Sequence, residues 1–500
     1  MCHVTRMNPL PYLILFALPV TLSFHWRHRS GFYDPPPLPN GVKVPKAQWF
    51  TQRLDHFDQQ NEATWKQRYF VNDTFWKKGG PIFLMLGGEG PSSPVWNVVG
   101  SWVGYAAQYG ALAIQVEHRF YGESHPTKDT TLESLRYLSS EQALADFAYF
   151  RQSMAIELGT GDAPWIVFGG SYSGALSAWI RLKYPNLFFG SIATSAPIQA
   201  KLNFVEYAEV VTASLATSSS ACVDAVKTAT TAFDALVKTT AGRASLSKQF
   251  KLCSPLQDDE NDIANFAEGA AGNFFGVVQY NKDNRAFEET VGTNITIDTL
   301  CSIMADTSVG DELARYAAVN TLMLKTYKVP CLDVNYTAMI EEMRNTTMAN
   351  EVIAGRMWFY QTCTEFGYYQ TSDSPNQPFG TLFPLSFAVQ QCVDVFGKDF
   401  DQDFIQKGID WTNENYGSLG INKTTSRTLF PNGSIDPWHA LGLTHVMDIL
   451  KDVNSIFIEG TAHCANMYPP LASDPPGLKD ARSTVMQAIG LWVLQAEAGH

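Results

Sequence analysis

The chain has 500 residues, 45% of them hydrophobic, so it can bury a large core, and its length predicts two or three domains. It contains 49 Asp and Glu against 36 Lys and Arg, a formal net charge of −13, and the basic residues form no cluster. A nucleic-acid-binding surface needs such a cluster, so we expect no nucleic acid partner.

The N-terminus carries an apolar run suited to export. Arg6 precedes the apolar residues 10–20, which are too few to span a bilayer but enough for a secretory signal peptide. We assign residues 1–24 to this signal, with an uncleaved anchor as the alternative. No later segment has the apolar length of a membrane span. The sequence therefore predicts a mature chain without a span, either secreted or in the lysosomal or vacuolar lumen.

The first half of the chain alternates between strand and helix patterns. Buried or half-buried strands are predicted at residues 65–72, 81–86 and 111–117, and apolar spacing of three and four predicts a helix at residues 140–150. Strands that alternate with helices form mostly parallel sheets covered on both faces.

An apolar run at residues 165–170 ends at Ser171 and continues at once as a helical pattern. A serine between a strand and a helix that follow each other directly lies in a strained turn, which exposes its hydroxyl. Gly169 and Gly174 are small enough for strand and helix to approach closely. The pattern predicts a nucleophile elbow, with the Tyr172 N–H facing a developing oxyanion. Taken alone, the same residues would suit a glycine-rich loop of any α/β protein.

Between residues 201 and 420 the sequence changes to helical patterns without buried-strand runs. We interpret residues 201–420 as a helical cap inserted into a catalytic domain at residues 45–200 and 421–500. Six cysteines lie in the insertion, and Cys464 follows it: Cys222, Cys253, Cys301, Cys331, Cys363 and Cys392. We expect three disulfides among the six, with open connectivity, and an unpaired Cys464. No CxxC or HxxxH spacing occurs, so neither a metal site nor another cofactor is expected.

Two later strands end in residues that complete a catalytic set. Residues 428–430 lead to Asp436, and residues 455–458 lead to His463. A serine hydroxyl is unreactive until an imidazole accepts its proton, and the imidazole needs a carboxylate that fixes its tautomer. The order Ser171, Asp436, His463 is that of α/β-hydrolases. We therefore predict an α/β-hydrolase fold, with a mostly parallel sheet, helices on both faces, an inserted helical cap, and these three residues as its triad.

In this fold the loop after an early buried strand completes the oxyanion hole. Residues 87–90 occupy that place, so Gly88 and Tyr172 are the expected donors. Three other histidines lack the required strand-end position late in the chain and are expected to be structural: His56, His118 and His439.

Glycosylation sequons suit a secreted or lysosomal glycoprotein. They begin at Asn72, Asn294, Asn335, Asn345, Asn422 and Asn432.

Five separated blocks carry a family resemblance: GPIFLMLGGEG from Gly80, EHRFYGES from Glu117, GGSYSGALSAWIRLKYP from Gly169, NGSIDPWHALG from Asn432 and GTAHCANMYP from Gly460. In these blocks the chain resembles the serine peptidase family of lysosomal Pro-X carboxypeptidase and dipeptidyl peptidase, and most of all its thymus-specific serine protease branch. The resemblance runs from about Gln48 to the C-terminus. It implies a serine exopeptidase that cleaves peptides after proline or another small residue, and it allows a homodimer.

The proline ring is apolar and lacks an N–H, so a dry aromatic pocket selects it. By the resemblance, Trp438, Trp358, Tyr360 and Met467 are expected to line such a pocket, with plain core packing as the alternative. Family members specialised for proline often carry methionine four residues after the nucleophile and tryptophan four after the histidine. This chain has Ala175 and Met467 there, which implies a roomier pocket and a looser preference.

Two other functions are open to this scaffold: a carboxylesterase or lipase, which uses the same machinery, and a non-catalytic binding protein, which usually loses a triad residue. The sequence does not separate amino- from carboxypeptidase modes. Glu89 and Glu365 are candidate acids for a terminal ammonium, and Arg119 and Arg356 are candidate cations for a terminal carboxylate.

Overall fold

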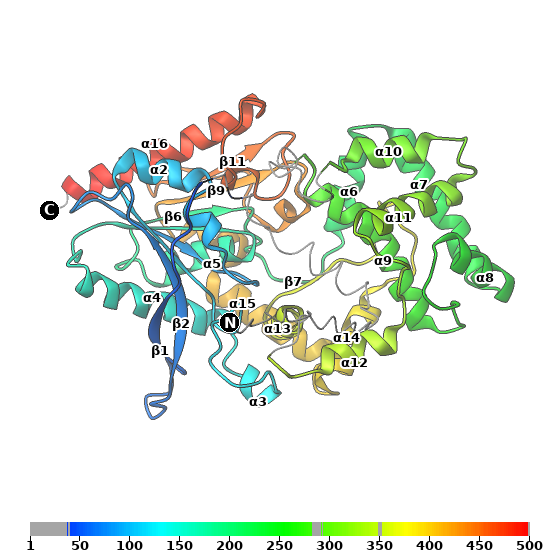
Figure 1. The fold of residues 1–500 in the computed structure, drawn as a ribbon, viewed down its shortest axis with the longest axis horizontal. Coiled ribbons are helices and arrows are strands. Elements are labelled where there is room, and N and C mark those ends of the chain that lie inside the picture. The colour runs from blue at the N-terminus through cyan, green and yellow to red at the C-terminus, as the bar shows by residue number, and fades with distance from the viewer. Residues whose placement is uncertain (1–37, 39–40, 283–291, 293, 349–352, 499–500) are drawn as a thin grey trace, which may run out of the picture.

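The computed structural model describes residues 38, 41–282, 292, 294–348 and 353–498, so the signal peptide expected at residues 1–24 lies outside the described residues. A nine-stranded sheet forms the centre of one half of the molecule, in the order β1-β2-β4-β3-β5-β6-β9-β11-β10 (Figure 1). Its strands are β1 (Gln48–Arg53), β2 (Thr64–Asn72), β3 (Ile82–Leu86), β4 (Leu112–Val116), β5 (Trp165–Gly170), β6 (Gly190–Thr194), β9 (Thr428–Gly433), β10 (Met447–Asp448) and β11 (Val453–Ile458).

The six central strands, from β4 to β11, pair in parallel. Only the edges are antiparallel, where β1 and β2 lie on one side and β10 on the other. The carboxyl ends of the parallel strands therefore meet along one rim of the sheet. In such sheets this rim carries the functional loops.

The sheet is covered on both faces, so strands β3, β4, β5, β6 and β9 are buried at every position. In β3, Ile82 and Leu84 join one hydrophobic cluster and Phe83 and Met85 the other, as alternate side chains point to opposite faces. Helices α4 (Ser140–Glu157) and α5 (Tyr172–Lys183) supply the first cluster. Helices α2 (Ser101–Tyr109) and α16 (Pro476–Ala498) supply the second. The predicted α/β-hydrolase fold is confirmed by this architecture.

The other half of the molecule is helical (Figure 1). It contains α6 (Glu206–Ala216), α7 (Ser220–Leu236), α8 (Thr240–Gln249), α9 (Glu260–Gln279), α10 (Ile297–Ala305), α11 (Glu312–Thr326), α12 (Tyr336–Arg344), α13 (Ile353–Gln361) and α14 (Leu385–Phe396). A π-helix, η3 (Thr362–Phe366), follows α13 directly. Two short strands, β7 (Lys201–Asn203) and β8 (Gly367–Tyr369), pair in parallel. The sequence pattern did not predict them.

Helix α15 (Gln402–Tyr416) falls inside the range predicted for the cap, yet it packs on the sheet half. Tyr416 stacks on Trp179 of α5 with ring centroids 4.2 Å apart, and Asn413 exchanges two hydrogen bonds with the backbone of Ala200. The Thr412 hydroxyl donates to the carbonyl oxygen of Glu365 in η3, so the helix joins the two halves. A shorter helix, α3 (Leu132–Leu135), precedes α4.

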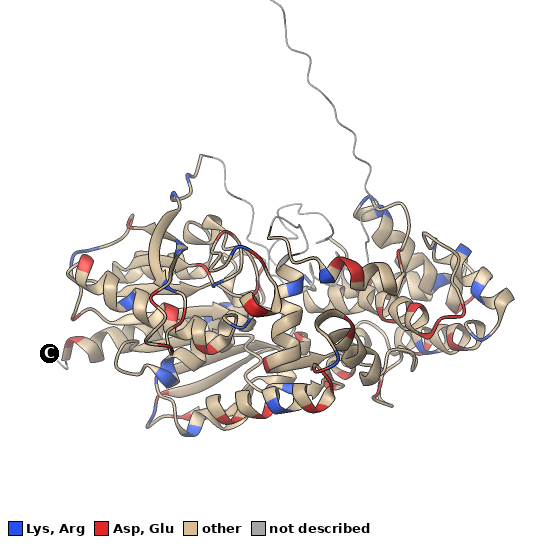
Figure 2. Ribbon diagram, turned by 90° about the horizontal axis from the view of Figure 1, so that it is seen from below, with Lys and Arg blue, Asp and Glu red and all other residues tan. Residues whose placement is uncertain are grey.

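The three disulfides expected in the middle of the chain are present. They join Cys222 to Cys301, Cys253 to Cys331 and Cys363 to Cys392, while Cys464 is unpaired, as predicted, and is buried. None of the helices among the described residues combines the length and apolar character needed to cross a bilayer. Acidic and basic residues are interspersed over both halves in the view of Figure 2.

One predicted glycosylation site is wrong. Asn432 is 1% exposed within β9, and its Nδ2 donates hydrogen bonds to the carbonyl oxygens of Phe430 and Leu443. A folded chain cannot present this side chain to a glycosyltransferase. Asn294, Asn335 and Asn345 are exposed, and Asn72 and Asn422 are half-buried.

Candidate active site

The turn between β5 and α5 is strained and tightly packed. Ser171 has φ 59° and ψ −131°, a conformation that non-glycine residues rarely adopt. A Cβ atom on Gly169 would lie 2.0 Å from the carbonyl oxygen of Ser173, and one on Gly174 would lie 2.4 Å from that of Thr194. Both obstacles are backbone atoms, so only glycine fits at either position.

The Gly169→Ala variant is therefore expected to unfold more easily than the parent, by about 3 kcal/mol, because the extra carbon forces the strand and the helix apart. Calorimetric unfolding measures the loss. Gly104→Ala is the matched control, since Gly104 is exposed in α2 and an added Cβ meets nothing within 4 Å. That variant should keep or slightly raise the melting temperature. Equal melting temperatures for the two variants would contradict the packing argument.

Asp436 and His463 form a buried pair at the rim. Asp436 follows β9 and His463 follows β11, both are 0% exposed, and Nδ1 of His463 lies 2.9 Å from Oδ2 of Asp436. Oδ1 of Asp436 accepts the N–H of Trp438 at 3.0 Å. Burial lowers the pKa of His463, but the charge and hydrogen bond of Asp436, together with those of Cys464, outweigh burial and raise the pKa well above its usual value. Nδ1 thus donates to the carboxylate, while Nε2 is buried and has no hydrogen-bond partner among the residues that the structure describes.

The residue before Ser171 and the residue after His463 contact each other, which brings the serine and the histidine to the same part of the rim. A Cβ on Gly170 would lie 2.9 Å from Sγ of Cys464, so the residue before the serine touches the residue after the histidine. The Ser171 N–H donates to the Thr194 carbonyl at 3.0 Å. The serine and Nε2 do not hydrogen-bond in this structure; such bonds are often long or misaligned before substrate binds.

The two expected oxyanion donors flank the serine. A Cβ on Gly88 would lie 3.3 Å from Cβ of Ser173, so the loop after β3 rests against the elbow. Tyr172 is the first residue of α5, where a backbone N–H has no intrahelical acceptor. Its phenol oxygen is held by Nε2 of Gln361 at 3.0 Å and contacts Nε2 of His118 at 3.1 Å. These contacts fix the start of the helix beside Ser171.

The other histidines lie in structural positions. Burial lowers the pKa of His118 to about 4, and its Nδ1 lies 2.7 Å from the carbonyl oxygen of Arg119, so this ring is neutral. His56 bonds Asp146 at 2.8 Å, and the ring of His439 packs on Phe457.

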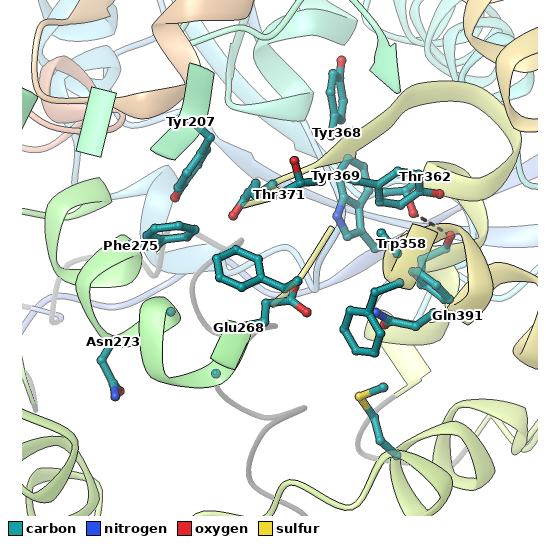
Figure 3. Close-up of a pocket in the computed structure, with 18 of the residues that line it drawn as sticks. Tyr207, Glu268, Asn273, Phe275, Trp358, Thr362, Tyr368, Tyr369, Thr371 and Gln391 are labelled. Atoms are coloured by element: carbon teal, nitrogen blue, oxygen red, sulfur yellow. Dashed lines mark hydrogen bonds between the residues drawn. The ribbon is translucent and has the colours of Figure 1, made fainter. Parts of the chain in front are cut away.

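A cavity lies between the rim of the sheet and the helical half. Figure 3 shows Tyr207, Glu268, Phe275 and Trp358 around its open space. Trp358 and Trp438 line the cavity together with Tyr368. Aromatic contacts run from Tyr172 to Trp358 (5.2 Å between centroids), from Trp358 to Tyr368 (6.5 Å) and from Tyr368 to Trp438 (5.4 Å). Tyr172, the residue after Ser171, is thus continuous with an aromatic wall.

Two expected pocket residues do not line this cavity. Tyr360 packs its ring against Phe396 and Phe400. Met467 belongs to the core cluster on the far side of the sheet, where its Sδ would lie 2.3 Å from a Cβ on Gly170. The first interpretation fails because Tyr360 is on the opposite side of α13 from Trp358, and the second because Met467 packs beneath the elbow.

Three of the four charged residues considered for binding a peptide terminus are held by hydrogen bonds or ion pairs inside the protein. Arg119 is fully buried and paired with Asp146 at 2.6 and 2.7 Å. Arg356 donates to the carbonyl oxygens of Thr130 and Met343. Glu365 accepts from the backbone and hydroxyl of Ser140 and from Gln361. Only Glu89 lines the cavity.

The sequence analysis missed Gln279, the last residue of α9. Its carbonyl oxygen accepts the N–H of His463 at 2.9 Å, and its Oε1 accepts from the Tyr207 hydroxyl at 2.6 Å and the Trp438 indole at 3.0 Å. One residue of the helical half therefore holds the histidine loop through its backbone carbonyl and the segment after Asp436 through its side chain. Nothing local distinguishes this glutamine in the sequence.

The described residues contain no group of three or more His, Cys, Asp and Glu side chains arranged to hold a metal ion.

Known proteins match this chain along most of its length. The family model described as serine carboxypeptidase S28 matches residues 52–485. Human thymus-specific serine protease is 34% identical over 472 residues, covering 92% of this chain and 89% of that protein. The mouse protein of the same name is 34% identical over 464 residues, covering 90% and 88%. Human lysosomal Pro-X carboxypeptidase is 28% identical over 470 residues, covering 92% and 90%. The chain belongs to the serine carboxypeptidase S28 family and is a serine-type peptidase.

Proposed function

We propose that this peptidase is an exopeptidase in which Ser171, His463 and Asp436 act as the catalytic triad. The observation that carries the proposal is the buried His463–Asp436 pair: Nε2 of His463 has no hydrogen-bond partner among the described residues, and the next residue, Cys464, lies against Gly170 of the elbow. Asp436 fixes the tautomer in which Nδ1 is protonated, so Nε2 is free to accept a proton.

The reaction follows the standard course for such a triad. Nε2 takes the Ser171 proton as Oγ attacks the peptide carbonyl, and the N–H groups of Tyr172 and Gly88 stabilise the oxyanion. The imidazolium then gives its proton to the leaving amine, which leaves an acyl-enzyme on Ser171. Water, deprotonated by the same nitrogen, hydrolyses the ester and restores the serine.

We place the residue before the scissile bond against the aromatic wall of Trp358, Tyr368 and Trp438. A proline ring offers this wall an apolar face, and it has no N–H to desolvate. The Pro-X carboxypeptidase among the relatives supports a preference for proline, and the absence of Tyr360 and Met467 from the lining supports tolerance of other small residues.

The proposal extends to the domains and the location. Residues 45–200 and 421–500 would form the catalytic domain, and residues 201–420 the cap, with α15 as the link between them. Three disulfides and the lysosomal relatives support a lysosomal or secreted protein that meets its peptide substrates in an oxidising lumen. A homodimer is part of the same proposal and rests on the family resemblance alone.

Mapping the covalent adduct of a fluorophosphonate probe tests the proposal directly. The purified enzyme is labelled and digested, and the modified residue is identified by tandem mass spectrometry. We expect one adduct, on Ser171. An adduct on a different serine, or none on an enzyme that still cleaves peptides, would overturn the triad.

A further inference from the structure

Glu89 is an unusual buried acid. Three glutamates are buried among the described residues: Glu89, Glu117 and Glu365. Glu117 is bound by Arg68 and Ser124, and Glu365 by Ser140 and Gln361. The carboxylate of Glu89, which is 5% exposed, accepts a hydrogen bond only from its own backbone N–H within the described part of the chain.

Burying a carboxylate without a partner is costly, and here burial raises its pKa to about 7. Packing does not explain the residue, since an apolar side chain of the same size would avoid the cost. Glu89 lines the cavity, so a cation bound there would pair with its carboxylate and offset part of this cost.

The position of Glu89 relates it to the reaction centre. It follows Gly88, the expected oxyanion donor, and its charge acts on His463. A cation held by Glu89 therefore lies close to the bond that Ser171 would cleave. Only a short stretch of peptide therefore fits between the cation at Glu89 and the scissile bond.

The charge of the cavity favours one end of a peptide over the other. Among the described residues that line it, Glu89 and Glu268 are acidic and none is Lys, Arg or His. Figure 3 shows Glu268 at the open space beside Trp358. The cations considered for a terminal carboxylate, Arg119 and Arg356, are both committed to internal contacts. The site thus suits a terminal ammonium and not a terminal carboxylate.

We propose that Glu89 binds the free N-terminal ammonium of the substrate, so that the enzyme releases short N-terminal fragments instead of C-terminal residues. This inference rests on the proposed function, because the distance from Glu89 has meaning only if Ser171 is the nucleophile.

The first test uses the wild-type enzyme and one proline-containing hexapeptide in three forms: unmodified, N-acetylated and C-amidated. Mass spectrometry identifies the products. We expect a short N-terminal fragment from the unmodified and amidated peptides and little cleavage of the acetylated one. Release of C-terminal residues, blocked by amidation, would overturn the inference.

The second test compares kcat/KM for a dipeptide arylamide with a free or an acetylated N-terminus. In Glu89→Gln, we expect the value for the free amine to fall by about 10- to 100-fold, as when a charged hydrogen bond is lost. The value for the acetylated substrate should change far less, so the preference for a free amine disappears. Glu123→Gln is the matched control, because Glu123 pairs with Arg68 at the surface and its side chain is 63% exposed. It should keep the wild-type preference.

Fluorophosphonate labelling of both enzymes separates the two possible failures. If the wild type is labelled on Ser171 but Glu89→Gln keeps the free-amine preference, the inference about Glu89 is wrong and the triad stands. If that preference is lost only in Glu268→Gln, the ammonium site belongs to the other acid and the inference is equally overturned. If the wild type is not labelled on Ser171, the proposed function itself fails.

Discussion

Replacing Ser171 with alanine is expected to lower kcat for peptide cleavage by about 10⁶-fold, since no other group can form the acyl-enzyme. The backbone conformation at residue 171 allows the variant and the parent to be compared without a difference in strain. Ser171 already has a positive φ with a Cβ in place, so alanine adds no strain that serine does not carry. Its side chain also makes no hydrogen bond that caps α5. The variant should fold as the parent does and should lose all labelling by a fluorophosphonate.

The neighbouring Ser173 provides the control. Its hydroxyl donates to the carbonyl oxygen of Gly170 at 2.9 Å and receives the N–H of the same residue at 3.0 Å, so it closes the turn. Ser173→Ala should lose about 1 kcal/mol of stability and still be labelled on Ser171. Retained peptidase activity in Ser171→Ala, with intact labelling, would assign the nucleophile to another residue.

The sequence located the strand-end residues well because each depends on a local pattern. A buried strand, a small-residue turn and a helix follow one another within residues 165–176, and parallel strands necessarily bring their carboxyl ends to one rim. Asp436 and His463 follow strands of the same sheet, so their meeting required only the strand order. The three disulfides among six cysteines followed from counting, whereas their pairing needed the packing of the helices.

The wrong predictions concern residues whose role depends on the direction in which the side chain points. Residues 358 and 360 lie on one helix, and two steps at about 100° per residue put them on nearly opposite sides. Only one of them could face the cavity, so expecting both Trp358 and Tyr360 there was inconsistent with helical geometry. The sequon at Asn432 was a motif in a strand whose every position is buried. Gln279 has no motif, and only the docking of α9 on the rim gives it a role.

Replacing Asp436 with asparagine is expected to lower kcat by about 10⁴-fold while leaving the fold intact. Asparagine keeps an oxygen that can accept the Trp438 N–H, so the turn after β9 retains its cap. Its amide donates to Nδ1 of His463, which shifts the imidazole proton to Nε2. That nitrogen then cannot accept the proton of Ser171. Thermal unfolding checks the fold, and steady-state kinetics with a proline arylamide measure kcat.

The pH profile distinguishes this electrostatic role from a purely structural one. Asp436 raises the pKa of His463, whereas burial lowers it. Only neutral imidazole accepts a proton. Wild-type kcat/KM is therefore at its plateau above the pKa of His463 and declines as the pH falls through that pKa. Without the carboxylate, burial lowers the pKa of His463, so the acid limb of the variant's pH profile moves to lower pH. A variant whose acid limb does not move, or whose kcat stays within tenfold of the wild type, would show that Asp436 does not set the state of His463.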